Sequence, residues 1–314
     1  MKRGGGVGRR DVLGAPFALL FCGRAAAASA EPFRVIDLRV GSQDDPISRA
    51  KVIVPEAARA TPKAALGATF AGDAGATSPK TLVLVLFHGL GETTDETAGV
   101  GAWSERYGLL TSYQRLRRPP VAFFDGRGAL TRARAGEIDR ELARRPFRGN
   151  IVFACPFTPN VWKFSHREKG MARIADWTIS TLLPEVLSKA GIAAGEATVA
   201  VGGCSLGGFV ALEVFLRRPA SFTAFSGVQS ALGKAHVARW ATRIEEAVRR
   251  VGPRRLLFET SRRDPFLDAN RVLAIELGRR KVPHDFVVAP GPHDQAWLRE
   301  VGTLEMLLWH DRAR

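Results

Sequence analysis

A serine between two glycines carries the clearest chemical signal in this sequence. The pentapeptide GCSLG spans residues 203–207, follows the short apolar run Val199–Val201, and precedes helix-like apolar spacing from Phe209 onward. A strand, a sharp turn and a helix in this order expose a nucleophilic serine at the edge of a sheet. The glycines fit this geometry because side chains there would collide where strand and helix approach each other. The pattern predicts Ser205 as a nucleophile; a Gly-rich turn without chemistry is the alternative.

Two side chains that would complete a catalytic triad each follow a later predicted strand. Asp264 comes after the strand at 255–259, and His293 after the strand at 284–289. Because the carboxyl ends of parallel strands meet at one edge of a sheet, we expect all three side chains to lie together there. His293 would then take the proton of Ser205, and Asp264 would orient the imidazole and stabilise its charged form.

Neighbouring titratable residues offer alternatives for two of these roles. His284 lies at the opposite end of the last strand and is the second candidate for the base. For the carboxylate, Asp268 lies one turn further on and Glu259 ends the preceding strand. Asp294 adjoins the histidine, but its place before a helix favours an N-cap role.

A second Gly-rich segment, HGLG, comes directly after the apolar run Thr81–Phe87. Glycines at this point let the backbone fold back beside the nucleophile, where an N–H group can stabilise an oxyanion. We expect the N–H of Leu90, or alternatively Gly89, to be one donor and the N–H of Leu206 to be the other. His88 is expected to hold this loop. A plain turn at the end of the strand is the alternative.

Aromatic residues in the segment 156–171 are candidates for contact with a substrate. This segment follows a predicted strand at 150–155 and contains Trp162 and Phe164. Loops after the carboxyl ends of strands line the site in open α/β sheets. We therefore expect Trp162 and Phe164 either to bind substrate or to pack beneath the loop.

The remaining pattern predicts an α/β fold with a mostly parallel central sheet and helices on both faces. Continuous Val and Leu runs such as TLVLVLF are typical of strands buried on both faces. Residues 56–80 are rich in Ala, Gly, Thr and Pro and predict a surface loop, and Pro184 predicts a kink. The expected strands are 33–38, 50–54, 81–87, 150–155, 199–201, 222–228, 255–259 and 284–289, and the expected helices are 101–116, 137–143, 174–187, 209–217, 240–251 and 297–309.

Residues 1–30 resemble an export signal. Arg9 and Arg10 form a twin-arginine-like basic start, the stretch 12–22 is mostly apolar, and Ala28-Ser29-Ala30 suits a cleavage site. The apolar stretch is too short and too interrupted for a transmembrane span, so we expect no stable insertion into a membrane. The sequence therefore predicts a periplasmic or secreted protein whose single functional domain spans residues 31–314.

Composition and cysteine content indicate which partners, disulfides and cofactors to expect. The chain of 314 residues has 46 Lys and Arg against 31 Asp and Glu, for a net charge of +15. The arginines are scattered and match no nucleic-acid motif, so we expect a basic surface and no nucleic-acid partner. Cys155 and Cys204 lie at the ends of separate predicted strands with no sign of close approach, which favours two free buried thiols. Without a Cys and His cluster at zinc spacing, we expect no metal and no cofactor.

Three segments together resemble the esterase D-like branch of the α/β-hydrolase superfamily. They are GGCSLGGFVALEVFLRRPASFTAFSG, the HGLG loop and PGPHDQAW, and the likeness covers residues 81–310. That branch includes feruloyl and acetylxylan esterases, S-formylglutathione hydrolases, polyhydroxybutyrate depolymerases and mycolyltransferases. The resemblance implies the α/β-hydrolase fold, a triad of Ser205, Asp264 and His293, and oxyanion donors at Leu90 and Leu206. Pro292 and the Ala-rich loop before residue 81 depart from the family pattern, which bears on the substrate class.

The expected activity is hydrolysis of a carboxylic ester through an acyl-enzyme intermediate, on a small-molecule or polymer-linked substrate. An acyltransferase or a peptidase on the same fold is the nearest alternative, since an alcohol and water compete for one acyl-enzyme. A non-catalytic binding protein that keeps the fold is the alternative from another class.

Overall fold

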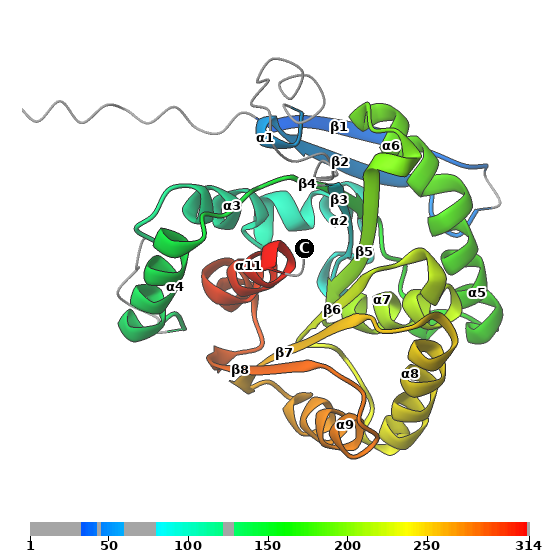
Figure 1. The fold of residues 1–314 in the computed structure, drawn as a ribbon. Coiled ribbons are helices and arrows are strands. Elements are labelled where there is room, and N and C mark those ends of the chain that lie inside the picture. The colour runs from blue at the N-terminus through cyan, green and yellow to red at the C-terminus, as the bar shows by residue number, and fades with distance from the viewer. Residues whose placement is uncertain (1–32, 43–44, 60–79, 122–128, 313–314) are drawn as a thin grey trace, which may run out of the picture. The chain divides into compact units, whose positions relative to one another are not determined.

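An eight-stranded sheet forms the centre of the protein, with its strands in the order β1-β2-β4-β3-β5-β6-β7-β8 (Figure 1). The computed structural model describes residues 33–42, 45–59, 80–121 and 129–312. Two pairs of neighbours, β1 with β2 and β2 with β4, are antiparallel, and all others are parallel. The strands are β1 (Phe33–Arg39), β2 (Arg49–Pro55), β3 (Thr81–Phe87), β4 (Ile151–Pro156), β5 (Ala197–Cys204), β6 (Ala224–Val228), β7 (Arg255–Arg263) and β8 (Asp285–Pro292).

Eleven α-helices within the described residues connect or flank these strands, together with π-helical turns at Ala102–Arg106, Thr178–Leu182 and Leu298–Gly302. The helices are α1 (Glu56–Arg59), α2 (Glu96–Gly101), α3 (Leu109–Arg117), α4 (Arg132–Arg144), α5 (Arg167–Trp177), α6 (Leu183–Ala190), α7 (Leu206–Arg217), α8 (Val237–Val251), α9 (Leu267–Arg279), α10 (Gln295–Trp297) and α11 (Thr303–Arg312).

Strand β3 shows why the sheet must be covered on both faces. All seven of its residues are buried. Val83, Val85 and Phe87 pack into one hydrophobic core, whereas the alternate residues Leu82, Leu84 and Leu86 pack into the other. Helices α5 to α9 cover the first face, and α3, α4 and α11 cover the second (Figure 1). The predicted α/β architecture is confirmed.

Several predicted elements differ in extent from the observed ones. The helix expected at 174–187 is part of a continuous run from α5 to α6, with Pro184 in the first turn of α6. Proline has no N–H for the helical hydrogen bond, and the π-helical turn Thr178–Leu182 ends two residues before it. Helix α9 was not expected, although Ala269, Leu273 and Leu277 follow helical spacing and are buried.

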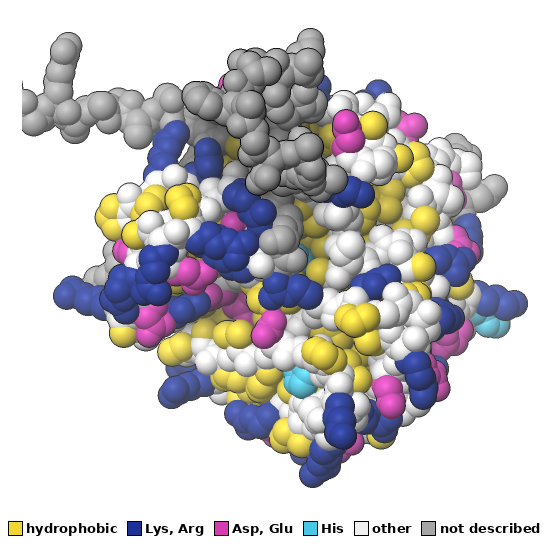
Figure 2. All heavy atoms as spheres, viewed as in Figure 1, with side chains coloured by type: hydrophobic (Ala, Val, Ile, Leu, Met, Phe, Trp, Pro, Cys, Tyr) yellow, Lys and Arg dark blue, Asp and Glu magenta, His cyan; other side chains and the backbone are white. Residues whose placement is uncertain are grey.

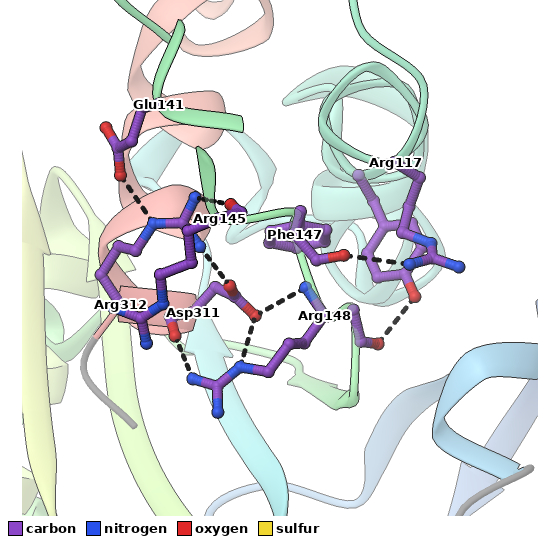
Figure 3. A network of polar contacts seen from close by, with 9 residues as sticks. Arg117, Glu141, Arg145, Phe147, Arg148, Asp311 and Arg312 are labelled. Atoms are coloured by element: carbon purple, nitrogen blue, oxygen red, sulfur yellow. Dashed lines mark hydrogen bonds and ion pairs between the residues drawn. The ribbon is translucent and has the colours of Figure 1, made fainter. Parts of the chain in front are cut away.

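A buried ion-pair network anchors α11, the helix that ends the described chain (Figure 3). The Asp311 carboxylate is inaccessible to solvent and accepts a hydrogen bond from the Arg148 backbone N–H at 3.2 Å. It also pairs with the Arg312 guanidinium at 2.8 Å, and that guanidinium reaches Glu141 on α4 at 2.6 Å. A buried carboxylate needs such partners, and here they fasten the last helix to α4 and to the segment before β4.

The surface carries many basic side chains without one dominant basic patch on the visible face. Lys and Arg side chains are spread over that face among apolar and acidic ones (Figure 2). No helix among the described residues is both long enough and apolar enough to cross a membrane. The predicted export signal and most of the predicted loop at 56–80 lie outside the described residues.

Candidate active site

Ser205 occupies a tight turn between β5 and α7 with an unusual backbone conformation. Its φ of 53° and ψ of −118° are rare for a residue with a side chain. The turn is held from both sides: the Ser205 N–H donates to Val228 at 2.9 Å, and the Ser205 carbonyl accepts from Phe209 at 3.2 Å and Ala231 at 2.9 Å. Every residue of α7 from Leu206 to Leu216 is buried, which fixes the helix behind the turn.

The two glycines of the pentapeptide are needed for close approach, as predicted. A Cβ atom on Gly207 would overlap the carbonyl oxygens of Phe87 and His88, and one on Gly203 would overlap the backbone of Gly207. The end of β3, the end of β5 and the start of α7 therefore touch through their backbones. Any side chain at these positions would push the Ser205 turn away from the loop after β3.

The structure brings Ser205, His293 and Asp264 together at the carboxyl ends of β5, β8 and β7. His293 Nε2 lies 3.1 Å from Ser205 Oγ, and His293 Nδ1 lies 2.9 Å from Asp264 Oδ1. The Asp264 side chain is fully buried, whereas that of His293 is 25% exposed. This is the geometry in which an imidazole accepts a hydroxyl proton while a buried carboxylate orients the ring.

The carboxylate of Asp264 is held by two further donors. Its Oδ1 accepts from the Phe266 N–H at 3.0 Å, and its Oδ2 accepts from the Thr260 hydroxyl. The Phe266 ring also packs edge-on against the imidazole of His293, with ring centres 5.6 Å apart. The carboxylate and the imidazole are both fixed by neighbours from the β7–α9 connection.

Pro292, which departs from the family pattern, helps to hold the histidine. Its carbonyl accepts hydrogen bonds from Gln229 Nε2 at 2.8 Å and from Ser261 Oγ at 2.9 Å. Gln229 itself lies just after β6 with a φ of 48° and is buried. The peptide that leads into His293 is therefore tied to β6 and β7, which sequence spacing did not indicate.

The alternatives to His293 and Asp264 lie elsewhere. His284 precedes β8, and its Nδ1 contacts the Val282 carbonyl at 2.9 Å. Asp268 is exposed on α9 and pairs with Arg271 at 3.6 Å. Glu259 is buried, its carboxyl has no hydrogen-bond partner among the described residues, and burial raises its pKa well above the usual range. None of the three contacts the imidazole of His293.

Asp294, next to the histidine, caps the short helix α10. Its carboxylate accepts a hydrogen bond from the Trp297 N–H at 2.8 Å. This is the N-cap arrangement predicted from its position before the helix. The side chain is therefore engaged away from the triad.

The predicted oxyanion donors flank the nucleophile turn. Leu206 is the first residue of α7, where an N–H group has no partner inside the helix. Leu90 opens the 3-10 turn Leu90–Glu92 directly after Gly89. A Cβ atom on Gly89 would lie 3.7 Å from the Ser205 Cβ, so this loop runs directly beside the nucleophile. Two backbone amides next to a serine can stabilise a developing oxyanion.

His88 holds the oxyanion loop, the structural role expected for it. Its Nε2 accepts a hydrogen bond from the Thr158 N–H at 2.8 Å, so the ring proton must be on Nδ1, which faces the Gly89 carbonyl at 2.9 Å. The Gly89 carbonyl and the Leu90 N–H belong to one trans peptide and point in opposite directions. By fixing the carbonyl, His88 sets the direction of the Leu90 N–H. Burial lowers the pKa of His88 to about 4.

We expect His88 to make the protein less stable in mild acid. The unfolded chain takes up a proton on this histidine below about pH 6.5, whereas the buried ring stays neutral down to about pH 4. The free energy of unfolding should therefore be highest above pH 6.5 and should fall by up to about 3 kcal/mol as the pH falls to 4. Urea unfolding at several pH values should show a smaller dependence in His88→Gln than in the unmodified protein. His166→Gln, at an exposed position, should keep the full dependence; equal slopes for both variants would contradict this role.

A buried polar network joins the oxyanion loop to the loop that follows His293. The Tyr107 hydroxyl accepts from the Gly89 N–H at 3.2 Å and donates to Glu92. The Glu92 carboxylate is 2% exposed and also accepts from Gln295 Nε2 at 2.9 Å. Sequence reasoning missed all three side chains, because they come from segments that only the fold brings together. They act on the site by holding its loops.

Tyr107→Phe should therefore slow the ester hydrolysis expected from the sequence without removing it. The change leaves the Gly89 N–H without its acceptor and Glu92 without one donor, which loosens the loop that presents the Leu90 N–H. We expect kcat to fall about tenfold, with a loss of roughly 1–3 kcal/mol in stability. Steady-state kinetics and thermal unfolding would measure the two effects. Tyr113→Phe removes a buried hydrogen bond to the Gly149 carbonyl instead, so it should lower stability and leave kcat unchanged; a similar kcat loss there would contradict the assignment.

A cavity of about 460 Å³ opens beside the triad, between α5, α7, α8 and the start of α9. Trp162 lines it and also packs against Phe209, and its predicted contact with a substrate stays a prediction. Phe164 does not line it, because its ring packs against Gly170 of α5. Phe164 instead lines a separate pocket together with Lys169 and Gly170, and both interpretations of its role stay predictions.

The thiols and possible metal ligands add no further chemistry to the triad. Cys155 and Cys204 are buried and free. Burial raises the pKa of Cys155 to about 12 and that of Cys204 further, so both are thiols near neutral pH. Among the described residues, no group of three or more His, Cys, Asp or Glu side chains is arranged to hold a metal ion.

Solved structures with a similar fold include hydrolases and a ferulic acid esterase. A ferulic acid esterase has a TM-score of 0.56 and 15% identity, covering 90% of this chain and 99% of its own. S-formylglutathione hydrolases from Staphylococcus aureus and Agrobacterium tumefaciens have TM-scores of 0.52 and 0.51, both at 14% identity. Both alignments cover 90% of this chain, and they cover 98% and 96% of the two hydrolases, respectively. No protein-family model and no curated protein matches the chain. At these identities the likeness establishes the α/β-hydrolase fold.

Proposed function

We propose that this protein is a serine hydrolase that cleaves carboxylic esters through an acyl-enzyme intermediate. The observation that carries the proposal is the hydrogen-bonded chain from Ser205 Oγ through His293 to Asp264. The names of similar solved structures, two S-formylglutathione hydrolases and a ferulic acid esterase, are consistent with it.

The proposed first half-reaction transfers the acyl group to the protein. Ser205 Oγ attacks the ester carbon while its proton moves to His293 Nε2, and the N–H groups of Leu90 and Leu206 stabilise the resulting oxyanion. When the tetrahedral intermediate collapses, the bond to the alcohol oxygen breaks and His293 gives its proton to that oxygen. The alcohol leaves, and the acyl group stays on Ser205.

The second half-reaction removes the acyl group and regenerates the free hydroxyl of Ser205. Water attacks the acyl carbon, one of its protons moves to His293 Nε2, and the same amides hold the second oxyanion. Collapse then breaks the bond to Ser205 Oγ, which recovers the proton from His293, and the carboxylic acid is released. The negative charge of Asp264 stabilises the imidazolium in both halves.

Reaction with a fluorophosphonate probe tests the proposal most directly. We expect one covalent adduct, at Ser205 by peptide mapping, together with turnover of 4-nitrophenyl acetate that the probe abolishes. A protein that neither reacts with the probe nor hydrolyses short esters would fit the non-catalytic alternative. Transfer to an added alcohol in preference to water would instead indicate an acyltransferase.

A further inference from the structure

The cavity beside the triad has flat aromatic walls. The rings of Trp162 and Phe209 lie with their centres 4.5 Å apart, and Trp240 packs edge-on against Phe209 at 5.7 Å. Trp162 is 38% exposed although it lines the cavity. A volume of about 460 Å³ between such walls suits a planar ring.

Residues that line this cavity also contact the triad. Phe266 lines it and also packs against the imidazole of His293. Phe209 and Ala231 line it as well, and their N–H groups both donate to the Ser205 carbonyl. The cavity therefore lies next to the triad, with the Phe266 ring between its interior and the imidazole of His293.

Charged side chains at the cavity carry an excess of positive charge. Glu213 is shared between Arg217 and Arg243, with bonds of 2.7 and 3.1 Å to the latter. Glu168 is shared between Arg217 and Arg239, the second pair at 3.1 Å. Glu213 and Glu168 therefore carry two negative charges against the three positive charges of the arginines that they pair with.

Arg167 adds a further cation with no opposing carboxylate. Its guanidinium lies 4.8 Å above the centre of the Trp162 ring. Among the described residues it forms no ion pair with an acidic side chain. A guanidinium stacked on an aromatic face keeps its N–H groups available for an anion. Arg167 therefore places a cation beside the aromatic side chains that line the cavity.

We propose that this cavity binds an aromatic group that bears a negative charge, so that the preferred substrates are anionic aromatic esters. The inference rests on the proposed function for its link to turnover. The aromatic walls hold the ring, and Arg167 pairs with the anion, a carboxylate or sulfonate. Neutral esters of the same shape lack that pairing and bind more weakly.

Binding to the full-length Ser205→Ala variant tests the inference separately from turnover. Two ester pairs serve as probes: methyl cinnamate with its 4-sulfonate, and benzyl acetate with its 4-sulfonate, which place the charged ring on the acyl or the alcohol side. In at least one pair we expect the sulfonated ester to bind about tenfold tighter by calorimetry at low salt. This preference should shrink as salt rises. In the active protein, the ratio of kcat/KM within that pair should follow the binding preference.

A matched pair of charge-removing variants locates the effect. In the Ser205→Ala background, Arg167→Gln should reduce the preference for the sulfonated ester several-fold. Arg249→Gln removes the same charge from an exposed position on α8 outside the cavity and should keep the preference. Equal binding within both pairs, or a preference that Arg167→Gln leaves intact, would overturn the inference. A retained binding preference in a protein that turns over no ester would support the cavity assignment and reject the proposed hydrolysis.

Discussion

Replacing Ser205 with alanine is expected to lower kcat for ester hydrolysis by at least about 10⁴-fold while the protein stays folded. The variant loses the only oxygen that His293 Nε2 contacts in the triad, at 3.1 Å, and with it the covalent intermediate. The turn itself should persist. Its positive φ is held by backbone hydrogen bonds to Val228, Phe209 and Ala231, and none of them uses the hydroxyl.

Ser230→Ala is the matched control for this prediction. Ser230 is buried close to the same turn, and its hydroxyl has no hydrogen-bond partner among the described residues. The control should therefore keep kcat and thermal stability. Hydrolysis of 4-nitrophenyl acetate and thermal unfolding would compare the variants. Residual activity in Ser205→Ala within tenfold of the unmodified protein would show that another group is the nucleophile.

Asp264→Asn is expected to lower kcat by about a thousandfold. Both the imidazole and the Phe266 N–H face Oδ1, so an asparagine is expected to place its oxygen there and its amino group toward the Thr260 hydroxyl. The histidine then keeps its tautomer, and what is lost is the negative charge that stabilises the imidazolium. A charged hydrogen bond in a buried site stabilises by a few kcal/mol, and losing that much in the transition state lowers kcat by about a thousandfold.

The alternative carboxylate provides the control. Asp268→Asn changes the same chemical group on exposed α9, where it pairs only with Arg271 among the described ion pairs. We expect this variant to keep the kcat of the unmodified protein. Steady-state kinetics on one ester would separate the two positions. A large loss at position 268 with a small loss at 264 would reverse the assignment of the triad carboxylate.

The sheet could be predicted from the sequence because continuous runs of apolar residues identify its central strands. TLVLVLF must be buried on both faces, and all seven residues are. The serine, aspartate and histidine could be placed because each follows such a strand, and strand ends meet at one edge. Helix α9 was missed, although its apolar spacing is present in the sequence.

Contacts between distant segments could not be predicted in this way. Trp162 and Phe164 are two residues apart in one loop, yet one lines the cavity and the other packs on Gly170. The positions of these two side chains depend on packing against α5 and α7, and a local sequence pattern does not show where those helices lie. The same holds for Glu92, whose partners Tyr107 and Gln295 are far from it and from each other in the chain.

The outer position of β8 has a consequence for the newly made chain. This strand is the last of the described strands to leave the ribosome, and it pairs with β7 alone at the margin of the sheet. A nascent polypeptide that ends before Asp285 contains Ser205 but lacks His293, the residue that would accept its proton. The proposed triad is therefore complete only after β8 has been synthesised and has paired with β7. Prematurely terminated chains should not hydrolyse esters.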